Sequence, residues 1–220
     1  MAGIKGGTSG LIVDTGAASG ANALHVQQRP TSYGSLGHYM VGVVTGTMAA
    51  GVGADSEILQ FRWTHASNLA VITLAELQFF NSLGTGFSAG LAQFDLTIAR
   101  SFSAAGTGGG TVTMTGDLQS LRTSMGTSLV GEIRVATTAA LGAGTKTLDS
   151  ERISRMKCTV GTATNTNYMQ TPAGVLYRAH DFDHPIVLAQ NEGLIVRATV
   201  PATGTWEAGI RLGWAEVTAY

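Results

Sequence analysis

The stretch from residue 185 to residue 217 constrains the fold more than any other part of this chain. Its last segment places apolar residues at every second position, at Trp206, Ala208, Ile210, Leu212 and Trp214. This period of two is typical of a β-strand with one buried face, because successive side chains point to opposite sides of a sheet. We therefore predict that this face shares one core with Leu194, Val196 and Val200 of the preceding segment.

The same stretch predicts two consecutive β-hairpins. Residues 185–189 and 194–200 form the first pair of strands, and we expect Gly193 in the loop between them to take a positive φ. Pro201 and Gly204 then form a second turn that leads into the strand with the two tryptophans.

The remainder of the chain has the same character, short alternating segments separated by Gly-rich turns. Residues 68–80 favour a strand, with a helix as the alternative because Ala, Leu, Glu and Gln are good helix formers. Asp117 is a candidate cap for one helical turn over residues 117–124. Polar composition predicts a surface segment over 148–157 and a turn at 172–174. Further strands are expected at 8–14, 22–29, 38–48, 56–63, 87–102 and 129–136.

About ten short strands with almost no helix predict an all-β fold, an antiparallel jelly-roll-like β-sandwich with long Gly/Thr-rich loops. We expect a single domain over residues 1–220. It would carry an N-terminal arm at about residues 1–20 and a loop-rich insertion at about residues 103–180. Within the insertion, composition predicts a flexible loop at 103–116 and a second loop of small residues at 137–147.

The low charge of the chain argues against some classes of partner. Charged residues make up 12% of the chain and the formal net charge is −1, so there is no basic cluster for phosphate and we expect no nucleic acid partner. The longest apolar region, residues 69–80, is interrupted by polar residues and too short for a membrane helix, so we expect no membrane partner. A surface this poor in charge predicts a homo-oligomer, since little repulsion keeps copies apart.

The first residues lack a basic segment followed by an apolar one, so we expect no secretory leader. The single cysteine, Cys158, excludes an internal disulfide and is compatible with assembly in a reducing cytosol.

Two motifs resemble catalytic or metal-binding sites. The segment from Gly86 to Gly90 matches Gly-x-Ser-x-Gly, but an alternating strand follows it where a hydrolase has a helix, which favours a turn. His180 and His184 flank two aspartates and are the weak candidates for a metal site, although no third cluster completes a ligand set. We therefore predict a protein that is not an enzyme, with no catalytic residue, no cofactor and no metal.

Trp63, Trp206 and Trp214 have two interpretations. Exposed in a groove they would stack on sugars, whereas alternating tryptophans in a β-sandwich more often belong to the core. We predict the core position for all three.

Several segments carry a resemblance: YGSLGHY at 33–39, EILQFRW at 57–63, HPIVLAQNEGLIVRATV at 184–200, and the strand at 206–217. Together they resemble virion structural proteins of tailed bacteriophages, which have jelly-roll folds and decorate heads or tails. The resemblance implies a capsid decoration or cement protein of the virion, assembled in the host cytoplasm. It further implies a homo-oligomer, with a trimer favoured, that binds the major capsid protein or other virion proteins. The alternative is a tail-associated module that binds a receptor or carbohydrate. No catalytic residue is transferred.

Overall fold

The computed structural model describes residues 36–49, 52–81, 90–115, 119–121, 125–160, 173–180 and 184–220, together with four short strands that precede them. The chain divides into two compact units, Met1–Thr31 and Ser32–Tyr220. The first unit holds two antiparallel pairs. They are β1 (Lys5–Gly6) with β2 (Leu11–Ile12), and β3 (Thr15–Ala18) with β4 (Ala21–Leu24).

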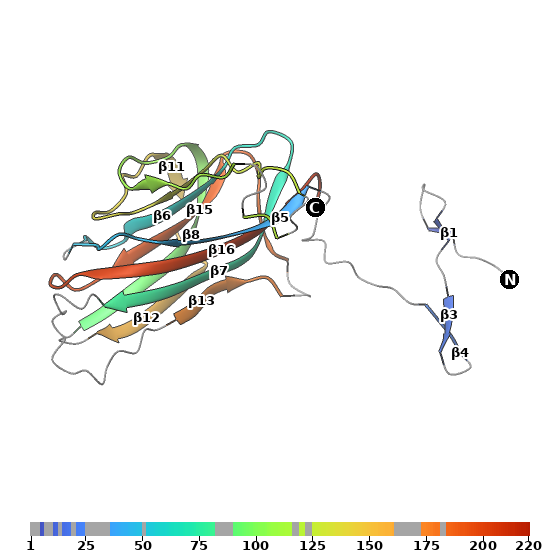
Figure 1. Cartoon of the computed structure of the whole chain (residues 1–220), viewed down its shortest axis with the longest axis horizontal. Helices are drawn as coiled ribbons and strands as arrows, with labels where there is room; N and C mark the ends of the chain where they lie inside the picture. The colour runs from blue at the N-terminus through green and yellow to red at the C-terminus, as the bar shows by residue number, and fades with distance from the viewer. Residues whose placement is uncertain are drawn as a thin grey trace. The chain divides into compact units, whose positions relative to one another are not determined.

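The second unit is a β-sandwich of two antiparallel sheets (Figure 1). The five-stranded sheet has the order β13–β7–β16–β5, and β14 pairs with the same side of β7 as β13 does. Its strands are β5 (Gly37–Val44), β7 (Leu69–Asn81), β13 (Ala173–Arg178), β14 (Ile186–Leu188) and β16 (Trp206–Val217). The long strand β16 lies at the centre, between β7 and β5.

The seven-stranded sheet has the order β11–β8–β15–β6–β10–β9, with β12 beside β8. Its strands are β6 (Ser56–Trp63), β8 (Gly90–Ala104), β9 (Gly110–Thr111), β10 (Glu132–Val135), β11 (Thr145–Leu148), β12 (Ser154–Val160) and β15 (Glu192–Thr199). Both sheets are antiparallel throughout, and none of the described residues is helical.

The main core lies between the two sheets. It contains the residues predicted to share it, from β15 and the turn after it (Leu194, Val196, Val200) and from β16 (Trp206, Ala208, Ile210, Leu212, Trp214). Rings from both sheets meet there: Phe61 packs against Trp214 with ring centroids 5.2 Å apart, and Phe94 packs against Phe79 at 5.3 Å. The alternation of β16 was therefore a sound indicator of its buried face.

The predicted pair of hairpins is wrong, although its strands exist. β14 and β16 belong to the five-stranded sheet, whereas β15 between them belongs to the seven-stranded sheet. The two short connections therefore carry the chain across the core instead of pairing neighbouring strands. Asn191, with φ 59°, provides the left-handed residue that was expected at Gly193, while Gly204 has the expected positive φ of 90°.

The structure also tests the predictions for individual segments. Residues 69–81 form a strand, so the helical alternative is wrong, because β7 is paired on both sides. The segment at 148–157 contains no buried residue, which agrees with its predicted surface position, but residues 154–157 belong to β12. Ala173 and Gly174 begin β13 where a turn was expected. Most of the expected helical turn at 117–124 lies outside the described residues.

Hydrogen bonds join the described parts of the two Gly-rich loops. The amide of Gly142 donates to the carbonyl of Thr107, and the amide of Leu141 donates to the carbonyl of Glu57, both at 2.9 Å. These bonds join the described parts of both loops to each other and to β6. Each loop also contributes a short strand, β9 or β11.

Candidate functional site

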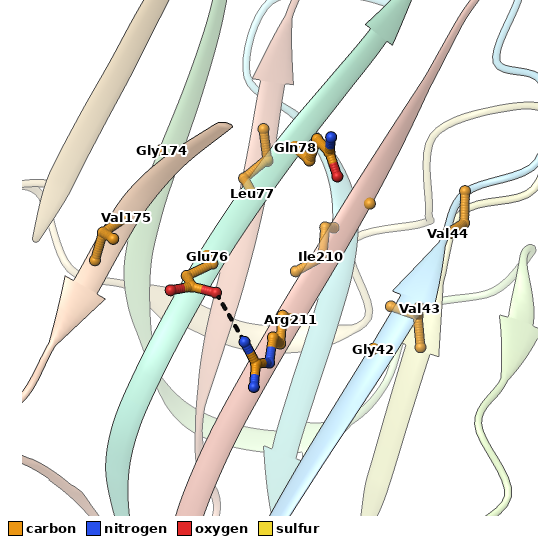
Figure 2. A pocket seen from close by; sticks show the side chains of 11 residues that line it. Gly42, Val43, Val44, Glu76, Leu77, Gln78, Gly174, Val175, Ile210 and Arg211 are labelled. Carbon is orange, nitrogen blue, oxygen red and sulfur yellow. Dashed lines mark hydrogen bonds and ion pairs between the residues drawn. The ribbon is translucent and has the colours of Figure 1, made fainter. Parts of the chain in front are cut away.

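The outer face of the five-stranded sheet carries a groove of about 540 Å³. It runs over four neighbouring strands, and Figure 2 shows the side chains that surround it. Its lining residues are Gly42, Val43 and Val44 of β5, Glu76, Leu77 and Gln78 of β7, Gly174 and Val175 of β13, and Gly209, Ile210 and Arg211 of β16.

The groove forms where glycines, which have no side chain, face outward. A Cβ atom added at Gly42 would meet no atom within 4 Å, so the backbone of β5 is open to solvent at this point. Gly209 faces outward on the adjacent strand, in register with Val44. Val44 and Val175 are 58% and 53% exposed on the strands at either side of the groove. An apolar, shallow surface of this kind is typical of a contact site for another macromolecule.

One acidic and two basic side chains pair at the groove. The carboxylate of Glu76 lies 3.4 Å from the guanidinium of Arg211 and 3.0 Å from that of Arg178. Figure 2 shows Glu76 and Arg211 facing each other from neighbouring strands. Arg211 Nε also contacts the sulfur of Met40 at 2.9 Å. Among the residues that line the groove, Glu76 and Arg211 carry opposite charges that pair with each other, and Arg178 adds one positive charge beside them.

The opposite outer face, on the seven-stranded sheet, holds buried charges. Asp95 of β8 is 1% exposed and accepts hydrogen bonds from Arg152 Nε at 2.6 Å and Arg155 Nε at 2.7 Å. Burial by itself raises the pKa of Asp95, but the hydrogen bonds from Arg155 and Arg152 outweigh burial, so this pKa lies below its ordinary value. Arg152 also pairs with Asp55 at 2.9 Å, which fastens the charged segment before β12 to the sheet.

A third carboxylate, Glu216, lies fully buried near the end of β16. It accepts hydrogen bonds from Ser128 Oγ at 2.6 Å, from the Leu129 amide at 3.0 Å and from Trp214 Nε1 at 3.1 Å. Burial raises the pKa of Glu216 above its ordinary value, and the hydrogen bonds from Ser128 and Trp214 only partly offset that effect. This carboxylate fixes the segment before β10 against the sandwich, which is a structural role.

The histidines proposed from the sequence do not assemble into a site that the structure displays. His180 and His184 are both exposed, and the residues between them lie outside the described part. His184 Nδ1 lies 2.7 Å from the carbonyl oxygen of Pro185, and its ring packs edge-on against Tyr220. Among the described residues, no three His, Cys, Asp or Glu side chains come together as metal ligands.

The remaining candidates are placed as follows. Trp63, Trp206 and Trp214 are 0% exposed, so they belong to the core as predicted and offer no stacking surface for sugars. In the Gly-x-Ser-x-Gly motif, Gly90 starts β8, and its other four residues lie outside the described range. The sequence analysis did not predict the groove. The signal in the sequence that could have indicated it is the presence of glycine at outward positions of two strands, Gly42 and Gly209.

In the part of the chain that the structure describes, there is no helix with the length and apolarity to cross a membrane. Comparison with known proteins identified no matching family model, no matching curated protein and no matching solved structure.

Proposed function

We propose that this protein is a non-enzymatic structural protein of a bacteriophage virion, a capsid decoration or cement protein that binds copies of itself and other virion proteins. The observation that carries the proposal is the open outer face of the five-stranded sheet. It combines exposed valines, bare glycine backbone and internally paired charges, and these are properties of a surface that is covered in an assembly.

The edge of this sheet supports the choice of a second copy as the occupant. Met40 donates its amide to Gln119, and His38 accepts from the amide of Leu121, so the first half of β5 is covered by residues 119–121. Alternate residues of a strand direct their backbone groups to the same side. Gly42 and Val44 therefore direct theirs toward the same edge, beside the groove. A strand from a neighbouring copy would continue the sheet at this point.

The strand order supports the jelly-roll part of the proposal. In the five-stranded sheet the first long strand, β5, lies beside the last, β16, and in the other sheet β6 lies beside β15. Such nesting of early strands against late ones is what two interleaved Greek keys produce. We favour a trimer, by analogy with jelly-roll virion proteins.

Native mass spectrometry tests the association directly. We expect an oligomer at micromolar concentration that persists in about 1 M salt, because apolar and backbone contacts are insensitive to screening. The variant Gly42→Arg should reduce it to a monomer of 22.7 kDa. Gly126→Arg is the matched control, since an added Cβ also meets no atom within 4 Å there. A wild-type monomer would contradict the proposal.

The location in a virion needs its own test. Peptide mapping of purified phage particles should find this chain in a fixed ratio to the major capsid protein. If the chain is absent from particles but still forms the oligomer, the proposed virion location is wrong and the proposed self-association stands.

The alternative, a tail-associated module that binds a receptor or carbohydrate, has weaker support. No aromatic residue is among those that line the groove, and sugar-binding grooves rely on stacked rings. Binding of the monomeric Gly42→Arg variant to host cells would favour this alternative.

A further inference from the structure

Three polar side chains are buried together beneath the loops that cover the outer face of the seven-stranded sheet. The side chains of Lys146 and Glu57 are 3% and 10% exposed, and Gln60 is 1% exposed. Their surroundings are apolar: the Lys146 amine lies 5.0 Å from the ring centroid of Phe102, and Gln60 pairs in register with Ile195. Phe102 and Ile195 belong to one small core on this face.

One carboxylate oxygen joins the amine to the amide. Glu57 Oε2 lies 2.9 Å from Lys146 Nζ and 2.6 Å from Gln60 Nε2. The Lys146 amine also donates to the carbonyl of Ala143. The cluster therefore contains a nucleophile (the Lys146 amine), a proton carrier (the Glu57 carboxylate) and an acyl group with a nitrogen leaving group (the Gln60 amide). The carboxylate contacts both of the other groups.

The carbonyl of Gln60 is polarised from its other side. Gln60 Oε1 accepts a hydrogen bond of 2.8 Å from the amide of Gly106. A donor at this position stabilises the negative charge that develops on oxygen when a nucleophile adds to the carbon. The loop approaches this closely because residue 106 is glycine: an added Cβ would lie 1.7 Å from the carbonyl oxygen of Gly142.

We propose that Lys146 and Gln60 form an intramolecular isopeptide bond, with Glu57 as the proton carrier. Glu57 takes a proton from the Lys146 ammonium, and the neutral amine attacks Cδ of Gln60. The bond from Cδ to Nε2 then breaks as Glu57 delivers this proton to Nε2, which leaves as ammonia. The second proton of the attacking nitrogen passes through Glu57 to the ammonia, which becomes an ammonium ion. An ammonium and a primary amide become a secondary amide and an ammonium ion, so no oxidant, reductant or cofactor is needed.

The bond would connect two strands that are not neighbours. β11 and β6 are separated by β8 and β15 in the sheet, so the link spans the covered face and fixes the loops on it. This inference does not depend on the proposed function, because it concerns the opposite face of the sandwich.

Intact mass spectrometry of the full chain tests the bond. We expect the wild-type protein to weigh about 17 Da less than its sequence, the mass of the ammonia released. The chain has lysines only at positions 5, 146 and 157, so tryptic mapping assigns the linked residue without ambiguity. Lys146→Arg and Glu57→Gln should both retain the full sequence mass. Lys157→Arg, at an exposed lysine, should still lose ammonia.

The wild-type measurement decides the question even if a variant fails to fold. A folded wild-type chain that keeps its full sequence mass after prolonged incubation would overturn the proposal. A loss of about 18 Da, with Lys146 linked to Glu57, would also overturn it, because water and not ammonia would then be the leaving group.

Discussion

The two outer faces of the sandwich differ in what covers them. Loops and the segment before β12 lie over the face of the seven-stranded sheet, so Gln60 and Asp95 are almost inaccessible there. The face of the five-stranded sheet is bare around Gly42, with exposed valines at Val44 and Val175. One face is therefore covered by the chain itself, whereas the other is open to solvent around Gly42.

This difference changes what a polar residue contributes. Asp95 on the covered face is held by two arginines away from water, so its charge depends on both of them. Glu76 on the open face also lies between two arginines, but they are each 56% exposed and screened by solvent. Substitutions on the covered face should therefore affect folding, and those on the open face should affect association.

The largest effect is expected from emptying the small core of the covered face. Phe102→Ala removes a fully buried ring that packs with Ala99 and Ile195, and it should lower the free energy of unfolding by about 3–5 kcal/mol. Phe80→Ala, at a half-buried ring beside Gly209 on the open face, should cost about 1 kcal/mol or less. Urea unfolding of the two variants measures the contrast, and equal costs would show that the covered face is not a core.

A smaller effect is expected from adding one methyl group to each face. At Gly193 a Cβ would lie 2.2 Å from the carbonyl oxygen of Phe61 and 2.7 Å from the ring of Phe102, so Gly193→Ala should destabilise by about 1–3 kcal/mol. Gly42→Ala meets nothing and should be neutral or stabilising by up to about 1 kcal/mol. Thermal unfolding of both variants checks this, and a tolerant Gly193 would mean that β6 and the Phe102 ring can shift to make room for the methyl group.

Local pattern predicted the strands better than their partners. The range expected for β6, residues 56–63, is the observed one, and the buried face of β16 followed from alternation alone. Short turns after β14 and β15 fit a hairpin and a crossing between sheets equally well, because only the distant strands β7 and β8 decide the pairing. The contact of Gln60 with Lys146 through Glu57 was invisible for the same reason, since it joins segments that are remote in sequence. The groove likewise forms only when β5 pairs with β16, which brings Gly42 and Gly209 onto adjacent strands.

The smallest effects are expected from substitutions in two ionic clusters, around Asp95 and around Glu76, and the effects should depend differently on pH. The folded-state pKa of Asp95 lies below its ordinary value of 3.8. Between these two pKa values, the folded protein therefore binds fewer protons than the unfolded chain. Its contribution to stability is therefore complete above pH 3.8 and is lost as the pH falls through the folded-state pKa. Asp95→Asn should cost about 1–2 kcal/mol near neutral pH, and its difference from wild type should shrink as the solution becomes acidic. Glu76→Gln, on the open face, should cost less than about 1 kcal/mol and act mainly on the proposed association. Urea unfolding of both variants across the acid range measures this, and a gap for Asp95→Asn that stays constant as pH falls would contradict the buried ion cluster.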